Sequence, residues 1–113
     1  MHEMSLCESV LQLIEQQAVS QNYHRVKTVW LEIGTLAGVE LEAMRFCFDA
    51  VTRTSLAEGA RLEIIEVPGQ GHCLSCGKTV SVVRRYDACP ECGGYPLRVT
   101  DGEQLRVKEL EVE

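Results

Sequence analysis

The first long segment of the chain, residues 5–21, repeats apolar side chains every three or four positions. This spacing is typical of an amphipathic helix with one buried face, and glutamine and glutamate fall on the opposite face. Ser5, with Glu8 three positions later, is the arrangement of a capping box, so the pattern predicts that the helix begins at Ser5. The predicted apolar face consists of Leu6, Val10, Leu13 and Ile14.

Three later segments alternate apolar with polar or charged residues, which predicts strands buried on one side. They are residues 24–36, 60–68 and 103–113. The alternation is clearest in the first of them, where it predicts that every second side chain faces a core. These inward positions are Val29, Leu31 and Ile33.

Helical spacing returns over residues 39–59, between the first two predicted strands. Residues 69–101 differ in texture, because glycine and proline recur there and the apolar periodicity nearly vanishes. We therefore expect an α+β fold with two helices packed on a three-stranded sheet. The helices and the sheet would form one domain from residues 1–68 and 102–113, and residues 69–101 would be an inserted module. The inner stripe of the second helix would be Met44, Cys47, Phe48 and Val51.

Four cysteines of the inserted module follow the spacing CxxC-x12-CxxC, with glycine directly after each pair. Each CxxC turn brings two sulfurs to one point, and four thiolates suit a tetrahedral zinc ion. About thirty residues bury too little apolar surface to fold alone, and structural zinc would supply the missing stability. The pattern predicts a zinc ribbon with a closed structural site, with an iron–sulfur cluster or a redox CxxC pair as alternatives. The predicted ligands are Cys73, Cys76, Cys89 and Cys92.

Three further residues, two cysteines and a histidine, are of metal-binding type. Cys7 and Cys47 lie on the predicted helix faces, where a free cysteine behaves as a small buried hydrophobe. A functional thiol is the alternative for both. His72, next to Cys73, is either an additional ligand or a solvated neighbour, and the second interpretation is favoured.

Composition restricts the class of protein. Hydrophobic residues make up 45% of the 113 residues, and no apolar run approaches the roughly 18–20 residues that span a bilayer. The first twenty residues lack the pattern of a secretory signal, so we expect a cytoplasmic protein whose six cysteines are thiols or metal ligands.

Charge and motifs argue against two functional classes. The net charge is −6, and residues 69–101 carry four basic and three acidic side chains, so no concentrated basic footprint marks a nucleic-acid site. No HExxH, GxSxG or phosphate-loop motif is present, and we expect no enzymatic activity.

The chain begins with MHE, which is a possible nitrogen-rich metal site. The amine of Met1, the imidazole of His2 and the backbone amides between them can close small chelate rings. A near-planar nitrogen set suits Ni(II) or Cu(II), whereas zinc prefers a tetrahedral site. Spacing alone favours an ordinary chain start, because a histidine at position 2 is common by chance.

Several stretches together resemble the HypA/HybF family of nickel metallochaperones for [NiFe]-hydrogenase maturation. They are MHEMSLCESVLQLIEQQA, RVKTVWLEIGTLAGVE, RFCFDAVTRTSLAEGARLEI and the paired CxxC module, in register over essentially the whole chain. The first and second of these stretches look closer to the HybF branch. Some members also serve urease and carry histidines in the zinc module, where this chain has only His72.

The resemblance implies two metal sites and two protein partners. Nickel would be held by the Met1 amine, by the amide and imidazole of His2 and by the Glu3 amide, and zinc by the four module cysteines. The implied partners are a HypB-type nickel GTPase and the hydrogenase large subunit. An exposed edge strand would also permit a weak homodimer. The alternative function is a zinc-ribbon protein-interaction adaptor without metal delivery.

Overall fold

The computed structural model describes residues 2–113, which form two compact units. The first unit contains the described residues up to Leu31 together with Val39–Ile64 and Arg106–Glu113. The second contains Glu32–Gly38 and Ile65–Leu105. No helix in the described residues is long and apolar enough to cross a membrane.

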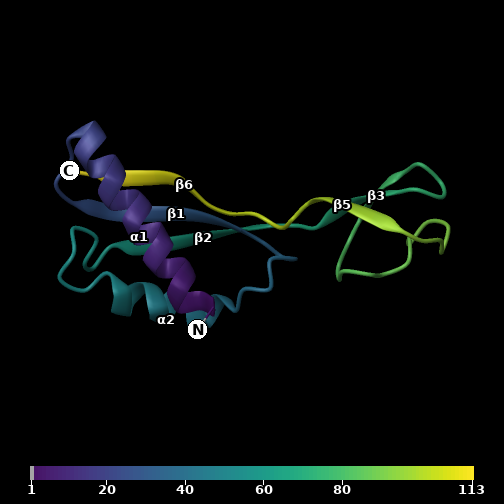
Figure 1. The fold of residues 1–113 in the computed structure, drawn as a ribbon, viewed down its shortest axis with the longest axis horizontal. Helices are drawn as coiled ribbons and strands as arrows, with labels where there is room; N and C mark the ends of the chain where they lie inside the picture. Colours follow the sequence, from purple (N-terminus) through teal and green to yellow (C-terminus); the bar gives the residue numbers. More distant parts are fainter. Residues whose placement is uncertain (1) are drawn as a thin grey trace. The chain divides into compact units, whose positions relative to one another are not determined.

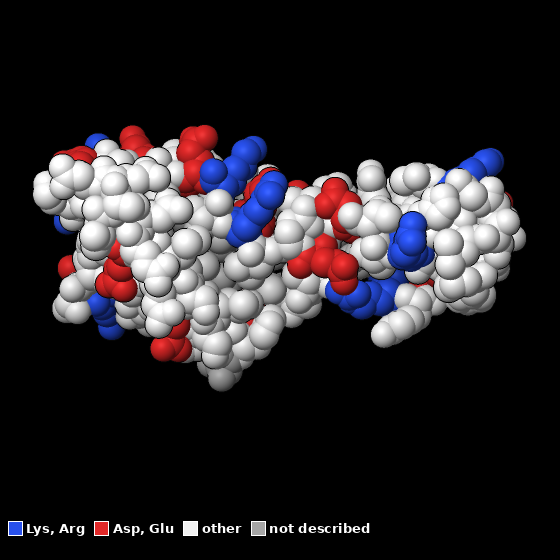
Figure 2. Space-filling view, turned by 45° about the horizontal axis from the view of Figure 1, so that its top comes forward, with Lys and Arg blue, Asp and Glu red and all other residues white. Residues whose placement is uncertain are grey.

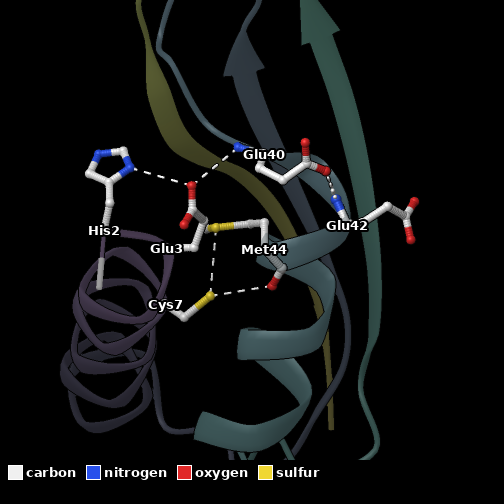
Figure 3. A network of polar contacts seen from close by, with 6 residues as sticks. All are labelled: His2, Glu3, Cys7, Glu40, Glu42 and Met44. Atoms are coloured by element: carbon white, nitrogen blue, oxygen red, sulfur yellow. Dashed lines mark hydrogen bonds and ion pairs between the residues drawn. The ribbon is translucent and has the colours of Figure 1, made fainter.

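Two helices and a three-stranded sheet account for most of the first unit, as the α+β prediction states. The helices α1 (His2–Gln21) and α2 (Leu41–Val51) pack against each other and lie on the same side of the sheet (Figures 1 and 3). In the sheet, β1 (Val26–Gly34) lies between β2 (Arg61–Val67) and β6 (Leu105–Val112).

The core of the first unit follows the predicted periodicity except on the first helix, where Leu13, predicted to face inward, is 41% exposed. On β1, the inward residues Val29 and Leu31 are fully buried. Tyr23 is also buried, and its hydroxyl donates a hydrogen bond of 2.7 Å to the carbonyl oxygen of Ile14. The helices contribute the buried residues Cys7, Val10, Ile14, Met44, Cys47 and Phe48.

The start of α1 differs from the prediction, because the helix begins at His2 and not at Ser5. Ser5 is an exposed residue inside the helix, so the predicted capping box is wrong. Glu3 lies in the first turn, where a negative charge is stabilised by the helix dipole. Its carboxylate also accepts the N–H of Glu3 itself, which satisfies one donor that the first turn leaves without a helical partner.

The second helix is shorter than predicted and ends at Val51. At its start, the carboxylate of Glu40 accepts the N–H of Glu42 at 3.1 Å. At its end, the hydroxyl of Thr52 donates to the carbonyl of Phe48 at 2.8 Å. Residues 52–59 form turns in which hydroxyl groups bond to nearby backbone, a local alternative that competes with continued helix.

The second unit contains a second three-stranded sheet, which the sequence did not predict. In this sheet, β3 (Gln70–Cys73) pairs antiparallel with both β4 (Thr79–Ser81) and β5 (Leu97–Asp101). These strands are three to five residues long, too short to show a reliable alternation. The core is correspondingly small, with Cys73, Val80 and Cys89 buried and Leu97 packed against them.

Candidate metal centres

The two CxxC segments of the second unit have the same backbone geometry. In the first, the N–H of Cys73 donates to the carbonyl of Lys78, and the N–H of Gly77 donates back to the carbonyl of Cys73. In the second, Cys89 donates to Gly94 and Gly93 donates back to Cys89. We call these the first and second knuckle.

A glycine with positive φ closes each knuckle. The φ of Gly77 is +78° and that of Gly93 is +72°, in the left-handed region that side chains rarely adopt. This backbone turns amide groups toward the sulfurs. The N–H of Cys76 donates to the sulfur of Cys73, and the N–H of Gly94 to that of Cys92, each at 3.4 Å.

The knuckles bring the four thiols together in a geometry that fits zinc. All four sulfurs lie within 4.8 Å of one another. The sulfurs of Cys73 and Cys92 are 3.7 Å apart, and those of Cys76 and Cys89 are 3.9 Å apart. Four sulfurs about 2.3 Å from a central zinc would stand about 3.8 Å from one another. The thiols therefore lie close to the corners of the tetrahedron that a zinc ion requires.

Hydrogen bonding already prepares one of the thiols for metal binding. The N–H of Cys76 lowers the pKa of Cys73 to about 6, with further help from the N–H of Ser75 and from neighbouring thiols. For Cys92, the N–H of Gly94 lowers the pKa, but hydrogen bonds with the other thiols and burial outweigh it and raise that pKa to about 11.

Charged residues of the second unit are largely paired with one another. Lys78 on the first knuckle lies 3.5 Å from Glu91 on the second. Arg84 pairs with Asp87, and Arg85 pairs with Glu103. On the face drawn in Figure 2, acidic and basic side chains likewise lie interspersed.

Two other predicted positions stand apart from the thiol cluster. His72 is partly buried on β3 and does not belong to the group of potential ligands found among the described residues. Met1, the first predicted nickel ligand, lies outside the described residues.

At the start of α1, the side chain of His2 is 57% exposed, and its Nδ1 lies 3.6 Å from a carboxylate oxygen of Glu3. The same oxygen accepts the N–H of Glu40 at 3.2 Å, so Glu3 joins the first turn of α1 to the residue before α2 (Figure 3). These bonds, with the N–H of Glu40 as the largest cause, lower the pKa of Glu3. The role of Glu40 has no signal in the sequence, because the two residues are 37 positions apart.

Known proteins resemble this chain over its whole length. It matches the family model described as hydrogenase/urease nickel incorporation, metallochaperone, hypA, over residues 1–112. It is 65% identical to the hydrogenase maturation factor HypA of Azotobacter chroococcum mcd 1 and 63% identical to that of Azotobacter vinelandii. Both alignments run over 113 residues and cover 100% of each chain.

Two solved structures share the fold. The solution structure of the Ni metallochaperone HypA from Helicobacter pylori has a TM-score of 0.72 at 23% identity and covers 97% of this chain and 96% of that one. A second solution structure of a HypA protein has a TM-score of 0.73 at 24% identity. The match covers 100% of this chain and 97% of that one. The matches do not distinguish the HybF branch from the rest of the family.

Proposed function

Because the chain belongs to the HypA family of nickel-incorporation metallochaperones, we propose that it binds one Ni(II) at its amino terminus and delivers it to the large subunit of a [NiFe]-hydrogenase. The observation that carries this proposal is the match to the family over residues 1–112, which includes the MHE start. We expect the protein to act in the cytoplasm. Besides the hydrogenase large subunit, its proposed partner is a HypB-type GTPase. Any GTP hydrolysis would belong to that partner.

The proposed nickel ligands are the amine of Met1, the amide and imidazole of His2 and the amide of Glu3. The start of α1 at His2 is compatible with this set, because the first four N–H groups of any helix lack a helical partner. The exposed imidazole of His2 is open to an ion from solvent. The Glu3 amide would give up its contact with the Glu3 carboxylate when it binds the ion.

The location of this set suits a site that must release its metal. All its ligands lie in the first turn of α1 or before it, so an acceptor can replace them one at a time without disturbing the core. The amine titrates at about pH 8, so nickel occupancy should fall as the pH drops. The carboxylate of Glu3 would keep the first turn of α1 bonded to the N–H of Glu40 while the amides of His2 and Glu3 bind and release nickel.

The zinc ion would have a structural part in this function. Cys73, Cys76, Cys89 and Cys92 would hold it, and their closed shell leaves no position for a substrate. The zinc would supply the folding free energy that the small core of the second unit lacks. We further propose that residues 1–68 with 102–113 serve nickel binding and residues 69–101 serve zinc binding.

A nickel titration of three zinc-loaded proteins tests the terminal site. The untagged chain should bind one Ni(II), with the absorption bands of a planar nitrogen complex. The variant His2→Ala and a chain with five residues, none of them histidine, added before Met1 should each lose this binding, because the first removes the imidazole and the second moves the amine too far from it to share one ion. Zinc content, measured in the same samples, should stay unchanged. Undiminished nickel binding in the extended chain would exclude the terminal site.

A further inference from the structure

Three sulfur-containing side chains are buried on α1 and α2, at residues that neither the nickel site nor the zinc site uses. We call Cys7, Met44 and Cys47 the sulfur cluster. Cys7 and Met44 are 0% exposed and Cys47 is 1% exposed. The thiol of Cys7 donates to the carbonyl oxygen of Met44 at 3.5 Å and lies 3.6 Å from the Met44 sulfur (Figure 3).

Cys47 completes this cluster from the same helix as Met44. It lies three positions further along α2, and residues at that spacing are neighbours on one helix face. Both are buried on the face that packs against α1. The charge of Cys47 also helps to raise the pKa of Cys7, after burial itself, so the two thiols are within electrostatic reach of each other.

The spacing of these sulfurs matches that of the zinc ligands. The distance of 3.6 Å between the sulfurs of Cys7 and Met44 compares with 3.7 and 3.9 Å between paired thiols of the zinc cluster. Two sulfurs at this separation can both reach a single ion at ordinary metal–sulfur bond length. We propose that the sulfur cluster is a third metal site, specific for monovalent copper.

The chemistry of the donors selects this ion. Thiolate and thioether sulfurs are soft ligands that favour Cu(I), whereas Ni(II) at the terminal site would bind nitrogen and Mg²⁺ or Ca²⁺ prefer oxygen. A monovalent ion with one thiolate is neutral, so the dry core accepts it more readily than a divalent ion. On binding, the Cys7 thiol releases its proton to solvent, a sulfur–copper bond replaces the S–H bond, and copper stays Cu(I). Met44 and Cys47 contribute sulfur lone pairs.

The ion can enter through the first turns of α1. Cys7 lies in the second turn of that helix, and helix ends open at low free-energy cost. Burial raises the pKa of Cys7 to about 12, so the metal-free chain keeps this sulfur protonated until an ion displaces the proton. The three metals would then be separated by ligand type: nitrogen for nickel, four thiols for zinc and the buried sulfur cluster for copper.

The test is a Cu(I) titration of the zinc-loaded full chain without oxygen, with copper presented as its bicinchoninate complex. We expect one Cu(I) per chain, full retention of zinc, and an X-ray absorption spectrum with sulfur alone in the first shell. The double variant Cys7→Ser/Cys47→Ser should bind no copper. Copper uptake matched by equal zinc release would overturn the proposal, because it would place copper at the zinc ligands.

Two conservative variants keep the test decisive if the double variant does not fold. Met44→Leu preserves volume in the core, and loss of the thioether should weaken Cu(I) binding by roughly tenfold. Val10→Ala, also a buried position of α1, removes core volume without removing sulfur and should leave copper binding unchanged. Equal copper affinity in the Met44→Leu variant and the unaltered chain would show that Met44 is not a ligand and overturn the three-sulfur site.

Discussion

Glu3 joins two segments that are distant in the sequence, and its ionisation should control that link. The N–H groups of Glu40 and of Glu3 itself lower the pKa of the Glu3 carboxyl below its usual 4.5. A carboxylate with a lowered pKa stabilises the folded chain above 4.5 and loses this contribution as the pH falls through the lowered value. We therefore expect the amide proton signal of Glu40 to shift in an NMR pH titration with a midpoint below 4.5.

The variant Glu3→Gln is the matched control for this titration. Its amide oxygen can still accept the N–H of Glu40 but does not ionise, so the step with the lowered midpoint should be absent from the Glu40 signal of this variant. A midpoint at or above 4.5 in the unaltered chain would show that the bond to Glu40 is not made in solution.

Cys7 should produce the opposite pH dependence, at the alkaline end. Burial, followed by the charges of Cys47 and Glu3, raises the pKa of Cys7 from 9.0 to about 12. The buried thiol favours the folded chain fully below 9.0, and this contribution is lost as the pH rises toward 12. Urea denaturation of the zinc-loaded chain should show a midpoint that falls over this range. The fall should be smaller in Cys7→Ala, and an equal fall in both proteins would contradict the assignment to Cys7.

The knuckles are the elements whose backbone conformation decides zinc affinity. Gly77 has a φ of +78° and open space where a Cβ would be, so Gly77→Ala adds backbone strain without a clash. This strain costs about 1–2 kcal/mol. Because the module folds around its metal, the cost should appear as roughly a tenfold loss of zinc affinity, measured by competition with a chelator.

Gly59 is the matched control for that substitution. Its φ is +76° and it too has open space at the Cβ position, but it lies in the first unit. Gly59→Ala should therefore lower the stability of the first unit by a similar amount and leave zinc affinity unchanged. Equal zinc affinities in the two variants would mean that the positive φ of Gly77 is not needed for zinc binding.

At the scale of elements, the sequence predicts a structure correctly when its hydrophobic pattern or residue spacing extends over more than one helical turn or a few strand residues. The alternation around Val29 and Leu31 and the spacing of the cysteines are such signals, and they predict β1 and the knuckles. The start of α1 at His2 lies ahead of the Ser5–Glu8 pattern from which it was predicted, and the contact with Glu40 depends on tertiary structure. Neither leaves a pattern along the chain, which is why both were missed.

At the scale of the molecule, the two units are stabilised by different means. The first buries side chains from two helices and a sheet, which is a conventional hydrophobic core. The second buries few apolar side chains besides Cys73 and Cys89: Ile33, Leu36, Val80 and Val82. A unit of this kind should depend on its metal, since structural zinc contributes on the order of 10–16 kcal/mol in peptides of similar design.

Removal of zinc should therefore unfold one unit and spare the other. When a strong chelator is added to the full chain, amide signals of residues 70–101 should collapse to disordered positions in an NMR spectrum, while those of α1 and β1 stay dispersed. Added zinc should restore the spectrum. Acid should favour the loss, because protons compete with zinc for the thiolates, including that of Cys73 with its pKa of about 6. Retention of the β3–β5 amide signals after complete zinc removal would show that the small apolar core is sufficient, and the structural role of the metal would have to be abandoned.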